Sequence, residues 1–498
     1  MPLLNNNLLQ HLQQQDNPSI SPPKYNREKL NAGIVHLGLG AFHRSHQAWY
    51  TERVLNKSNE EELNWGIIAC SIRSAQVKNE LDKQNTLYCL QEQSERTRLE
   101  IIGCIKEVLV IKDEAQKVID TIADQNIHIV TLTVTEKGYC IKSSAGGLNS
   151  DLPEIQRDLQ TLKNQDTQPQ TVIGVLVAAL QKRKTQNAPL SIISCDNLPG
   201  NGKILESAVC EFAAMVDPAL CDWINKEVSF PSTMVDRITP ATTARDIEQF
   251  QHLWGFSDNA PINAEPFSQW VIEDRFKTER PAWEKAGATF VEDVEPYEIM
   301  KLRLLNGSHS LLAYAGFLSG CETVNQCMNT SNLQALCKQF MACVEQSIDV
   351  PPGFNIRHYQ AELLERFANP ALAHRTFQIA TDGSQKIPQR WLNALHDLNQ
   401  HNKDAPIICL ALAAWIRFCR GENEQGEKYE LNDPMAETLL ELANTHVGQA
   451  REQVAAFTKI KSIFIHPISA DVQSTIAELL EHINRHGIQQ TLTHFLKT

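Results

Sequence analysis

One short segment of the chain gathers residue types that can move a proton. Lys301, Asn306 and His309 stand in an otherwise largely apolar stretch that predicts a buried helix. At about 100° per residue, the three side chains fall within an arc of roughly 140°, so one pocket could collect them. A lysine desolvated by an apolar wall has its pKa lowered toward neutrality and can act as a general acid/base. An asparagine amide can donate to a carbonyl oxygen that gains negative charge, and an imidazole can orient the lysine or bind a hydroxyl.

The same segment also has a purely structural explanation. A lysine can extend from a buried helix to water, and Asn306-Gly307 can mark a kink. Tyr297 and Lys301 form the Y-x-x-x-K spacing of short-chain dehydrogenases, but that family carries the pair within one compact Rossmann domain. Here the pair lies far from any glycine turn, so we interpret Tyr297 as a residue at the start of the helix. The residues alone leave the catalytic and the structural explanation open.

A second candidate site is a glycine turn between a predicted strand and a predicted helix. GIVHLGLG (33–40) ends in Gly38 and Gly40 and precedes helix-compatible sequence. In nucleotide-binding folds the first glycine permits the tight turn, and the second lets backbone amides approach a pyrophosphate. The third glycine of G-x-G-x-x-G is replaced by His43. The turn is therefore equally compatible with a dinucleotide site and with a plain strand-to-helix turn.

The residues after the next strand bear on which dinucleotide would bind. NAD-binding folds place a carboxylate there for the ribose 2′-hydroxyl. This chain continues as Ser71-Ile72-Arg73-Ser74 and has no carboxylate before Glu80. Arg73 could face a 2′-phosphate instead, so NAD and NADP both stay open.

Three further polar clusters stand in apolar surroundings. Asn197 follows a buried strand in CDNLPGNG, where α/β enzymes gather ligands, although Asn, Pro and Gly also build plain turns. Asp236 and Arg237 stand together in FPSTMVDRITP, a pattern typical of a buried structural ion pair. The run His43–His46 has two imidazoles but no acid at ligand spacing, which favours phosphate contacts or a helix surface over a metal site.

The elements that must position these residues change in character along the chain. Up to about residue 295, short β-branched runs alternate with amphipathic helices, which predicts an α/β domain with parallel strands. From about residue 296, apolar residues recur every three or four positions, which predicts a mainly helical domain. We expect an N-terminal arm at 1–24, an α/β domain at 25–295 and a helical domain at 296–498. The expected strands are 33–40, 65–72, 101–111, 127–134 and 191–197, and the expected helices are 113–124, 171–184, 298–318, 332–347, 357–367, 405–420, 433–445 and 471–486.

Composition limits the function classes. The 498 residues carry 46 Lys and Arg against 59 Asp and Glu, a net charge of −13, which disfavours nucleic acid or an anionic membrane as partner. Thirteen cysteines are scattered without a C-x-x-C pair or zinc-ribbon spacing, and the N-terminus has no signal-peptide pattern. We therefore expect reduced thiols, no metal and a cytoplasmic location. The longest apolar stretch, IICLALAAWIRFC, is too short for a membrane span and contains Arg417.

Taken in order, these pieces resemble the mannitol dehydrogenase family, the polyol-specific long-chain dehydrogenases. The resemblance implies a zinc-independent enzyme with an N-terminal Rossmann-type domain, a helical C-terminal domain and an active site between them. It implies NAD as cofactor, with NADP not excluded, a sugar acid or polyol as substrate, and a monomer or small homo-oligomer. The matching segments run through most of the chain and are GLGAFHRSHQ (38–47), TVTEKGYC (133–140), SCDNLPGNG (194–202), FPSTMVDRITPAT (230–242), EPFSQWVIED (265–274) and KLRLLNGSHS (301–310).

The resemblance also assigns roles to individual residues. Lys301 is similar to the family's general acid/base, and Asn197 and Asn306 are similar to its oxyanion-stabilising amides. His309 resembles the substrate-orienting imidazole, and Glu298 a residue that gates proton exchange with solvent. The substrate-side positions are Asp236, Arg375 and Lys386, and the cofactor-side positions are Gly38, Gly40, Phe42, His43, Arg44, Arg73, Thr135 and Glu136.

Within the family, TVTEKGYC, KLRLLNGSHSLLAY and HRTFQIATDGSQKIPQR look more like fructuronate reductases (mannonate oxidoreductases) than mannitol 2-dehydrogenases. A hexuronate carries a carboxylate, which a guanidinium can bind bidentately, and the last segment offers His374, Arg375, Lys386 and Arg390. Mannitol dehydrogenases place an arginine where Gln378 stands here. We therefore predict reversible reduction of D-fructuronate to D-mannonate at C2. The alternatives are mannitol/fructose or tagaturonate as substrate, and a non-catalytic nucleotide-responsive binding protein.

Overall fold

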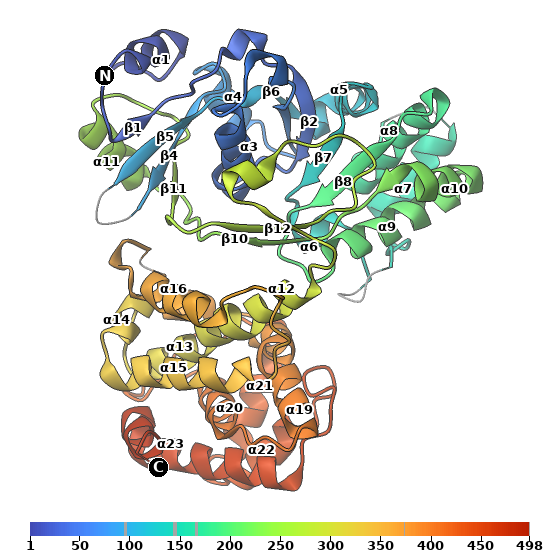
Figure 1. Ribbon diagram of the computed structural model, residues 1–498. Helices are drawn as coiled ribbons and strands as arrows, with labels where there is room; N and C mark the ends of the chain where they lie inside the picture. The colour runs from blue at the N-terminus through green and yellow to red at the C-terminus, as the bar shows by residue number, and fades with distance from the viewer. Residues whose placement is uncertain (94–96, 143–146, 165–167, 373, 498) are drawn as a thin grey trace. The chain divides into compact units, whose positions relative to one another are not determined.

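The computed structural model describes residues 1–93, 97–142, 147–164, 168–372 and 374–497. The chain forms two compact units, Met1–Glu295 and Pro296–Thr498. The first unit is built from strands and helices, and the second is helical (Figure 1).

A six-stranded parallel sheet forms the centre of the first unit (Figure 1). Its order is β6-β3-β2-β7-β8-β9, which counted along the chain is the doubly wound order 3-2-1-4-5-6 of Rossmann folds. In such sheets ligands bind at the carboxyl ends of the strands where the order reverses, here β2 and β7. The predicted α/β fold with a mostly parallel sheet is confirmed. The strands are β2 (Ala32–Leu37), β3 (Gly66–Ser71), β6 (Ile105–Val110), β7 (Ile129–Leu132), β8 (Leu190–Ser194) and β9 (Val228–Ser229).

Both faces of this sheet are buried, which explains why its strands read as nearly continuous apolar runs. Successive strand residues point to opposite faces, and Ile34 and Val35 of β2 accordingly belong to different apolar clusters. Helices α5, α8 and α9 pack in the cluster that contains Val35, whereas α3 packs in the cluster that contains Ile34. The helices of this region are α2 (Ala41–Ser45), α3 (Gln47–Leu55), α4 (Gln76–Asp82), α5 (Ile111–Ala123), α6 (Thr135–Gly138), α7 (Pro153–Asn164), α8 (Val172–Gln186), α9 (Asn201–Val216) and α10 (Pro218–Glu227).

Two smaller sheets complete the first unit. One has the order β1-β5-β4-β11 and the other β10-β12-β13. The predicted single strand 101–111 is wrong, because Gly103 and Cys104 separate two strands, β5 and β6, that belong to different sheets. The elements are β1 (Ile20–Ser21), β4 (Tyr88–Glu92), β5 (Arg98–Ile102), β10 (Thr233–Asp236), β11 (Ile262–Ala264), β12 (Gln269–Glu273) and β13 (Thr289–Val291), with helices α1 (Asn6–Gln13) and α11 (Ala244–Trp254).

The N-terminal residues pack into the first unit. Strand β1 pairs with β5, and Leu4, Leu9 and Leu12 lie in one apolar cluster with Phe250 and Phe256. The segment 1–24 is therefore held by a sheet pairing and by buried leucines.

The second unit is an assembly of helices around α13 and α20. Every residue of α20 after Pro406 is buried, as expected of a helix that is apolar on all sides, and it packs against α13 and α23. The larger predicted helices are present, and the sequence analysis missed α14, α22 and the short helices between 376 and 400. The elements are α12 (Glu295–Met300), the π-helical η4 (Lys301–Asn306), α13 (Gly307–Leu318), α14 (Val324–Met328), α15 (Ser331–Glu345), α16 (Ile356–Ala368), α17 (Thr376–Ile379), α18 (Gly383–Ile387), the π-helical η6 (Pro388–Leu392), α19 (Asn393–Gln400), α20 (Pro406–Phe418), α21 (Ala436–Thr445), α22 (Ala450–Phe457) and α23 (Ala470–Phe495).

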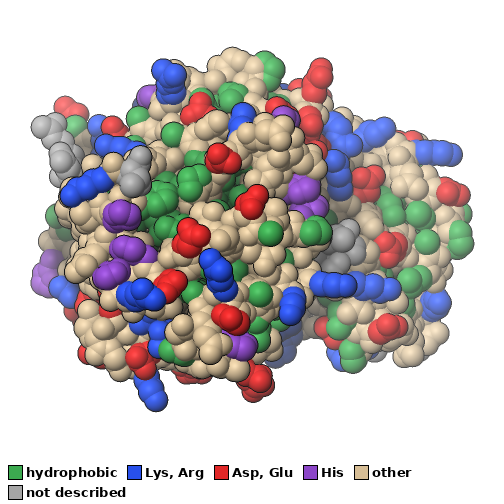
Figure 2. Space-filling view, turned by 90° about the horizontal axis from the view of Figure 1, so that it is seen from below, with side chains coloured by type: hydrophobic (Ala, Val, Ile, Leu, Met, Phe, Trp, Pro, Cys, Tyr) green, Lys and Arg blue, Asp and Glu red, His purple; other side chains and the backbone are tan. Residues whose placement is uncertain are grey.

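The charged side chains and the cysteines are distributed as follows. On the face shown in Figure 2, acidic and basic side chains are interspersed. All thirteen cysteines are free thiols. Among the described residues, no helix combines the length and the apolar character needed to cross a bilayer.

Candidate active site

The glycine turn lies at the carboxyl end of β2, next to β7, where the strand order reverses. Gly38 has a φ of +103°, and a Cβ at this position would lie 2.1 Å from the backbone oxygen of Thr133. The hydroxyl of Thr133 donates to the backbone oxygen of Gly38 at 2.8 Å, which ties the ends of β2 and β7 together. Gly40 precedes α2, and a Cβ there would meet nothing closer than 3.8 Å. The turn thus leaves open space before the first amides of α2, as a dinucleotide pyrophosphate requires.

The buried imidazole of His36, in β2, lies next to the glycine turn. His36 Nδ1 lies 2.7 Å from Thr131 Oγ1, and His36 Nε2 lies 3.0 Å from Thr133 Oγ1. The ring of His43 stacks on it with ring centroids 3.4 Å apart. Burial lowers the pKa of His36 to about 3 and the pKa of His43 well below its usual value, so both rings are neutral at pH 7. The sequence analysis missed His36, whose signal is a single polar residue inside an apolar strand.

The predicted cofactor-side residues differ in exposure. Arg73 lies two residues after the end of β3 and is exposed, and Thr135 and Glu136 after β7 are exposed as well. Arg44, in contrast, is buried, and its Nη1 donates to the backbone oxygen of Ala260 at 2.6 Å. Its guanidinium therefore has a packing role inside the first unit, as does the buried ring of His43.

Phe42 is half-buried and stacks on His46, with ring centroids 4.9 Å apart. His46 also interrupts the helix, because its φ of −118° and ψ of −90° separate α2 from α3. The sequence predicted helix-compatible residues through this point, and the break turns the glycine segment into one short helix followed by a second.

Asp196 holds the loop after β7, a contact that the sequence analysis missed. Its carboxylate accepts hydrogen bonds from the backbone amides of Val134 and Thr135, both at 2.9 Å, and from the Tyr139 hydroxyl at 2.7 Å. Thr135 has a φ of +63°, which is unfavourable for a β-branched residue. Burial raises the pKa of Asp196, and these three hydrogen bonds oppose that rise. Asp196 could have been singled out from the sequence, because it directly precedes the candidate Asn197.

The two other first-unit candidates lie at or just beyond the carboxyl ends of strands. Asn197 is exposed just beyond β8, and Asp236 is the buried last residue of β10. Arg237 next to it has a completely buried side chain and forms an ion pair with Glu92 at 3.1 Å. The guanidinium also donates to the backbone oxygens of Ser45 and Glu265. Arg237 is therefore structural, and its ion-pair partner comes from β4.

In the second unit, the predicted catalytic helix contains a π-helical stretch. Lys301–Asn306 form η4 between α12 and α13, and the amide of Gly307 bonds to the carbonyl of Leu302, five residues back. The prediction of one regular helix over 298–318 is wrong here, because each π turn holds more residues than an α turn. The arc worked out for regular α-helical geometry does not apply. Such turns are often found at functional sites.

Contacts from η6 secure the junction of η4 and α13. Arg390 Nη1 donates to the backbone oxygen of Asn306 at 3.2 Å and to Ser310 Oγ at 2.8 Å. Trp391 Nε1 donates to the backbone oxygen of Gly307 at 3.0 Å. These donors bind the main chain beside Asn306 and thereby fix the position from which its amide extends.

The predicted residues of this helix are all buried: Glu298, Lys301, Asn306 and His309. The ring of His309 packs on Phe367 and meets His374 edge-on, with ring centroids 4.5 and 5.3 Å away. Burial, followed by the neighbouring His374, lowers the pKa of His309 well below its usual value. A neutral imidazole at this position can donate to or accept from a hydroxyl group.

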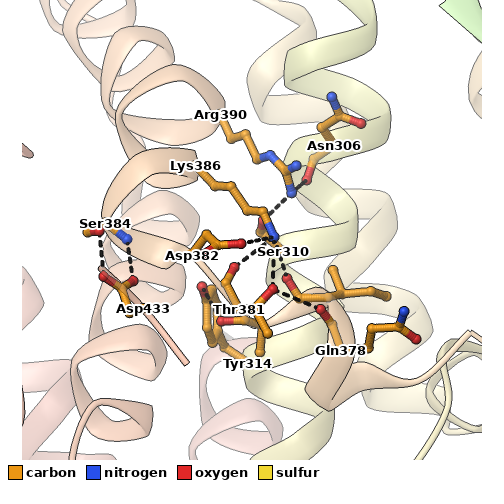
Figure 3. A network of polar contacts seen from close by, with 12 residues as sticks. Asn306, Ser310, Tyr314, Gln378, Thr381, Asp382, Ser384, Lys386, Arg390 and Asp433 are labelled. Atoms are coloured by element: carbon orange, nitrogen blue, oxygen red, sulfur yellow. Dashed lines mark hydrogen bonds and ion pairs between the residues drawn. The ribbon is translucent and has the colours of Figure 1, made fainter. Parts of the chain in front are cut away.

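Lys386 and Arg390 belong to one polar network beside this helix (Figure 3). Lys386 Nζ donates to the backbone oxygen of Thr381 at 2.7 Å and lies 3.9 Å from Asp382 Oδ2. Burial, and then the nearby charge of Arg390, lower the pKa of Lys386 to about 8. Burial also lowers the pKa of Arg390 to about 10. Arg375 is exposed at the start of α17.

Fold and site together define a class of protein. One chain joins a doubly wound sheet, with a glycine turn at its switch point, to a helical unit with a buried lysine, asparagine and histidine. This is the architecture of a two-domain oxidoreductase. Among the described residues, no three His, Cys, Asp or Glu side chains gather as metal ligands would.

Comparison with known proteins makes this assignment specific. The Mannitol dehydrogenase Rossmann domain model matches residues 32–285, and the Mannitol dehydrogenase C-terminal domain model matches residues 293–484. The chain therefore belongs to the mannitol dehydrogenase family of oxidoreductases.

Individual relatives span nearly the whole chain. The D-mannonate oxidoreductase of Escherichia coli (strain K12) is 38% identical over 95% of this chain and 98% of its own length. The Mannitol 2-dehydrogenase of Phaeosphaeria nodorum is 35% identical over 96% of this chain and 84% of its own. The structure of Pseudomonas fluorescens mannitol 2-dehydrogenase in ternary complex with NAD and D-mannitol superposes with a TM-score of 0.84 at 36% identity and covers 99% of both chains. The resemblance drawn from the sequence is confirmed.

Proposed function

We propose that this chain catalyses the reversible, NAD-dependent reduction of D-fructuronate to D-mannonate at C2. The observation that carries the choice of a sugar acid is the network of Lys386 and Arg390. Arg390 contacts the main chain of Asn306, a proposed catalytic residue, and Lys386 lies close enough to Arg390 for that charge to lower its pKa. A carboxylate on the substrate is the natural partner of such cations.

The first unit supplies a site that fits NAD. Gly38 makes a turn that no other residue could make without moving Thr133, and the space beyond Gly40 is open. The amides at the start of α2 would bind the pyrophosphate, and the exposed Arg73 would lie near the adenosine ribose. NAD, when bound, supplies and accepts the hydride. The solved relative in complex with NAD and D-mannitol supports this assignment, and NADP stays an alternative because no carboxylate follows β3 before Glu80.

The second unit supplies the proton chemistry. We assign Lys301 as the general acid that protonates the oxygen at C2 during reduction, and as the base that removes the hydroxyl proton during oxidation. Lys301 is buried, and a positioned lysine amine can serve as a general acid or base. Asn306 would donate to this oxygen as it gains charge, and we assign Asn197 as a further oxyanion-stabilising amide. His309 is neutral and would orient a neighbouring hydroxyl, while Glu298 would pass protons between Lys301 and solvent.

The remaining predicted residues would select the substrate. We assign Asp236 to a substrate hydroxyl, and Lys386 and Arg375 to the carboxylate. The thirteen free thiols support a reducing, cytoplasmic compartment for the enzyme.

A panel of substrates tests the proposal. One preparation is assayed with fructuronate, tagaturonate and fructose, each with NADH and with NADPH. We expect kcat/KM to be highest with fructuronate and NADH. Highest activity with fructose would replace the proposal with mannitol 2-dehydrogenation, the activity for which several relatives are named. No oxidation of NADH with any substrate would instead indicate a nucleotide-binding protein without catalysis.

The role of Lys301 is tested separately from the substrate. Lys301→Met keeps the side-chain length but removes the amine, so we expect turnover to fall by roughly two to four orders of magnitude, the usual range for a lost general acid/base. NADH binding, followed by fluorescence, should be unchanged. The exposed Lys403 in the same unit offers a control, and Lys403→Met should retain full turnover. Near-normal turnover of Lys301→Met would refute the assignment.

A further inference from the structure

Two cysteines of the second unit lie together at a cavity. Cys321 follows α13, and Cys327 is in α14. Their thiols are hydrogen-bond partners. Cys321 is half-buried and lines a cavity of about 630 Å³, together with Arg375 and Phe377, whereas Cys327 is buried behind it. One thiol of the pair is therefore open to small molecules, and its partner is within reach of it.

The buried thiol is fixed against α13. A Cβ added at Gly316 would lie 2.3 Å from Cys327 Sγ, so the sulfur occupies the space that this glycine leaves free. Cys327 Sγ also lies 3.7 Å from the backbone oxygen of Leu312. Any displacement of this sulfur therefore changes a contact on the same helix that carries His309.

The accessible thiol is tied through its backbone to a segment beside the candidate site. Thr376 Oγ1 donates to the backbone oxygen of Cys321 at 2.8 Å, and the Thr376 amide donates to that of Glu322 at 3.0 Å. In return, the amide of Val324 donates to the backbone oxygen of His374 at 3.0 Å. His374 contacts His309. The loop at Cys321 thus holds the segment that places one ring against a proposed catalytic imidazole.

We propose that Cys321 and Cys327 form a peroxide-sensitive dithiol whose oxidation to a disulfide loosens the segment 374–376. In the first step the thiolate of Cys321 attacks the hydroxyl oxygen of a hydroperoxide, an S–O bond forms and the O–O bond breaks. This leaves a sulfenic acid and an alkoxide, which takes a proton from water. In the second step the sulfur of Cys327 attacks that of Cys321, the S–S bond forms and the S–O bond breaks. The proton of Cys327 leaves with the hydroxide as water, and two electrons have passed from the sulfurs to the hydroperoxide.

The two thiols differ in the way such a reaction requires. The hydrogen bond from Cys327 lowers the pKa of Cys321 to about 7, and the same contact, with burial, raises the pKa of Cys327. At pH 7 about half of the accessible sulfur is thus in the nucleophilic thiolate form, and the buried one is a thiol, which must give up its proton as it attacks the sulfenic acid. A disulfide draws the two sulfurs to about 2.05 Å, closer than a hydrogen bond, and so displaces either Cys327 from Gly316 or the backbone of Cys321.

A second pair of cysteines provides a matched control. Cys210 and Cys221 of the first unit are also hydrogen-bond partners and half-buried, but burial raises the pKa of Cys210 to about 12. Proximity of two thiols alone would make both pairs react alike. The proposal instead requires the pair at Cys321 to react first.

Peptide mapping of the full-length protein after graded hydrogen peroxide tests the chemistry. Cleavage after Glu322 separates the two cysteines, so a disulfide is detected as a linked peptide pair that a thiol reductant releases. We expect this link to form before any link between Cys210 and Cys221, and to be absent in Cys321→Ser but present in Cys210→Ser. In Cys327→Ser, a sulfenic-acid reagent should label Cys321. Absence of the link between Cys321 and Cys327 in the parent protein, or a link that forms first at Cys210, would overturn the proposal.

Hydrogen exchange and kinetics test the consequence. In the oxidised protein the amides of Val324 and Thr376 should lose protection, and this readout is independent of the reaction catalysed. The kinetic readout rests on the proposed function: oxidation should raise KM for the sugar substrate, by roughly three- to thirtyfold if the coupling is of ordinary size, and leave NADH binding unchanged. A disulfide that forms without loss of protection at either amide would refute the link to segment 374–376. If the enzyme acts on another substrate, the peptide map and the exchange still decide the proposal.

Discussion

His36 and His43 stack face to face, with ring centroids 3.4 Å apart and planes inclined by 12°. His43 stands where dinucleotide-binding motifs place their third glycine, the residue that lets helix and strand approach closely. In this chain the contact between α2 and β2 is made by two buried aromatic rings instead. The stacked rings therefore take the place of the close helix–strand contact that the missing glycine would allow. Both rings must stay neutral for the stack to persist.

The histidine stack predicts a loss of stability in acid. Because the folded protein holds the pKa of both imidazoles far below 6.5, the unfolded chain binds more protons as the pH falls below 6.5. The free energy of unfolding then declines from pH 6.5 toward pH 3, by up to about 1.4 kcal/mol per pH unit for each histidine. His43→Phe keeps a stacked ring without a proton site, so its decline should be shallower. Urea unfolding at pH 7 and pH 5 measures this, and the exposed His252→Phe should decline as the parent does.

The glycine turn predicts a sharp difference between two glycines. Gly38→Ala forces a Cβ against Thr133 at 2.1 Å, in a backbone conformation that alanine disfavours, so both folding and NADH affinity should suffer. Gly255 also has a positive φ, +74°, but open space around it. Gly255→Ala should therefore cost only the strain of the left-handed conformation, about 1–2 kcal/mol. Thermal unfolding and NADH titration of both variants check this, and equal behaviour would show that the close approach at Gly38 is unimportant.

Much of the first unit could be predicted because parallel buried strands leave strong apolar runs in the sequence. The central strands around Ile34, Ile67, Val130 and Ile192 were found this way. The strands β5 and β6 were merged because their apolar residues are contiguous across Gly103, and no local signal shows that they enter different sheets. Sheet membership depends on pairing with distant residues, which one sequence does not show.

The candidate site was predictable in residue type but not in geometry. Lys301, Asn306 and His309 are conspicuous as polar groups in an apolar helix. The π-helical turn that carries two of them depends on donors from η6, such as Arg390 and Trp391, more than 80 residues away. Asp196 was passed over for a similar reason, since its role lies in accepting amides from a separate loop.

The carboxylate of Asp196 predicts a strongly destabilised variant. Asp196→Asn replaces one acceptor oxygen with an amide that cannot accept from Val134 or Thr135, and leaves a buried donor without its charged partner. Loss of such a bond costs about 1–3 kcal/mol. The same loop includes two proposed cofactor-side residues, so NADH affinity should fall too. Asp222→Asn on the exposed surface of α10 should change neither quantity, and unaltered affinity in Asp196→Asn would contradict the proposed role of the loop.

Arg390 predicts a kinetic effect without direct contact with the reacting atoms. Arg390→Lys keeps the charge, but a single ammonium does not reproduce the contacts with Asn306 and Ser310. We expect kcat to fall roughly tenfold, the equivalent of about 1.4 kcal/mol of lost transition-state stabilisation, with NADH binding unchanged. The exposed Arg451→Lys serves as control. Loss of NADH binding together with kcat would indicate a general folding defect instead of a positioning role.

Lys386 predicts a pH dependence that separates charged from neutral substrates. Its pKa of about 8 means that the ammonium is present below pH 8 and is lost as the pH rises above 8. If it binds a carboxylate, KM for fructuronate should be lowest below pH 8 and should rise above it, approaching tenfold per pH unit. KM for fructose, which has no carboxylate, should not follow this curve, and the ratio of the two cancels ionisations that affect both substrates. Lys386→Met should show a raised KM for fructuronate below pH 8, where the parent carries the ammonium, and a flat ratio between pH 7 and 9. A ratio that still changes with pH in this variant would assign the titration to another group and leave the carboxylate without its proposed partner.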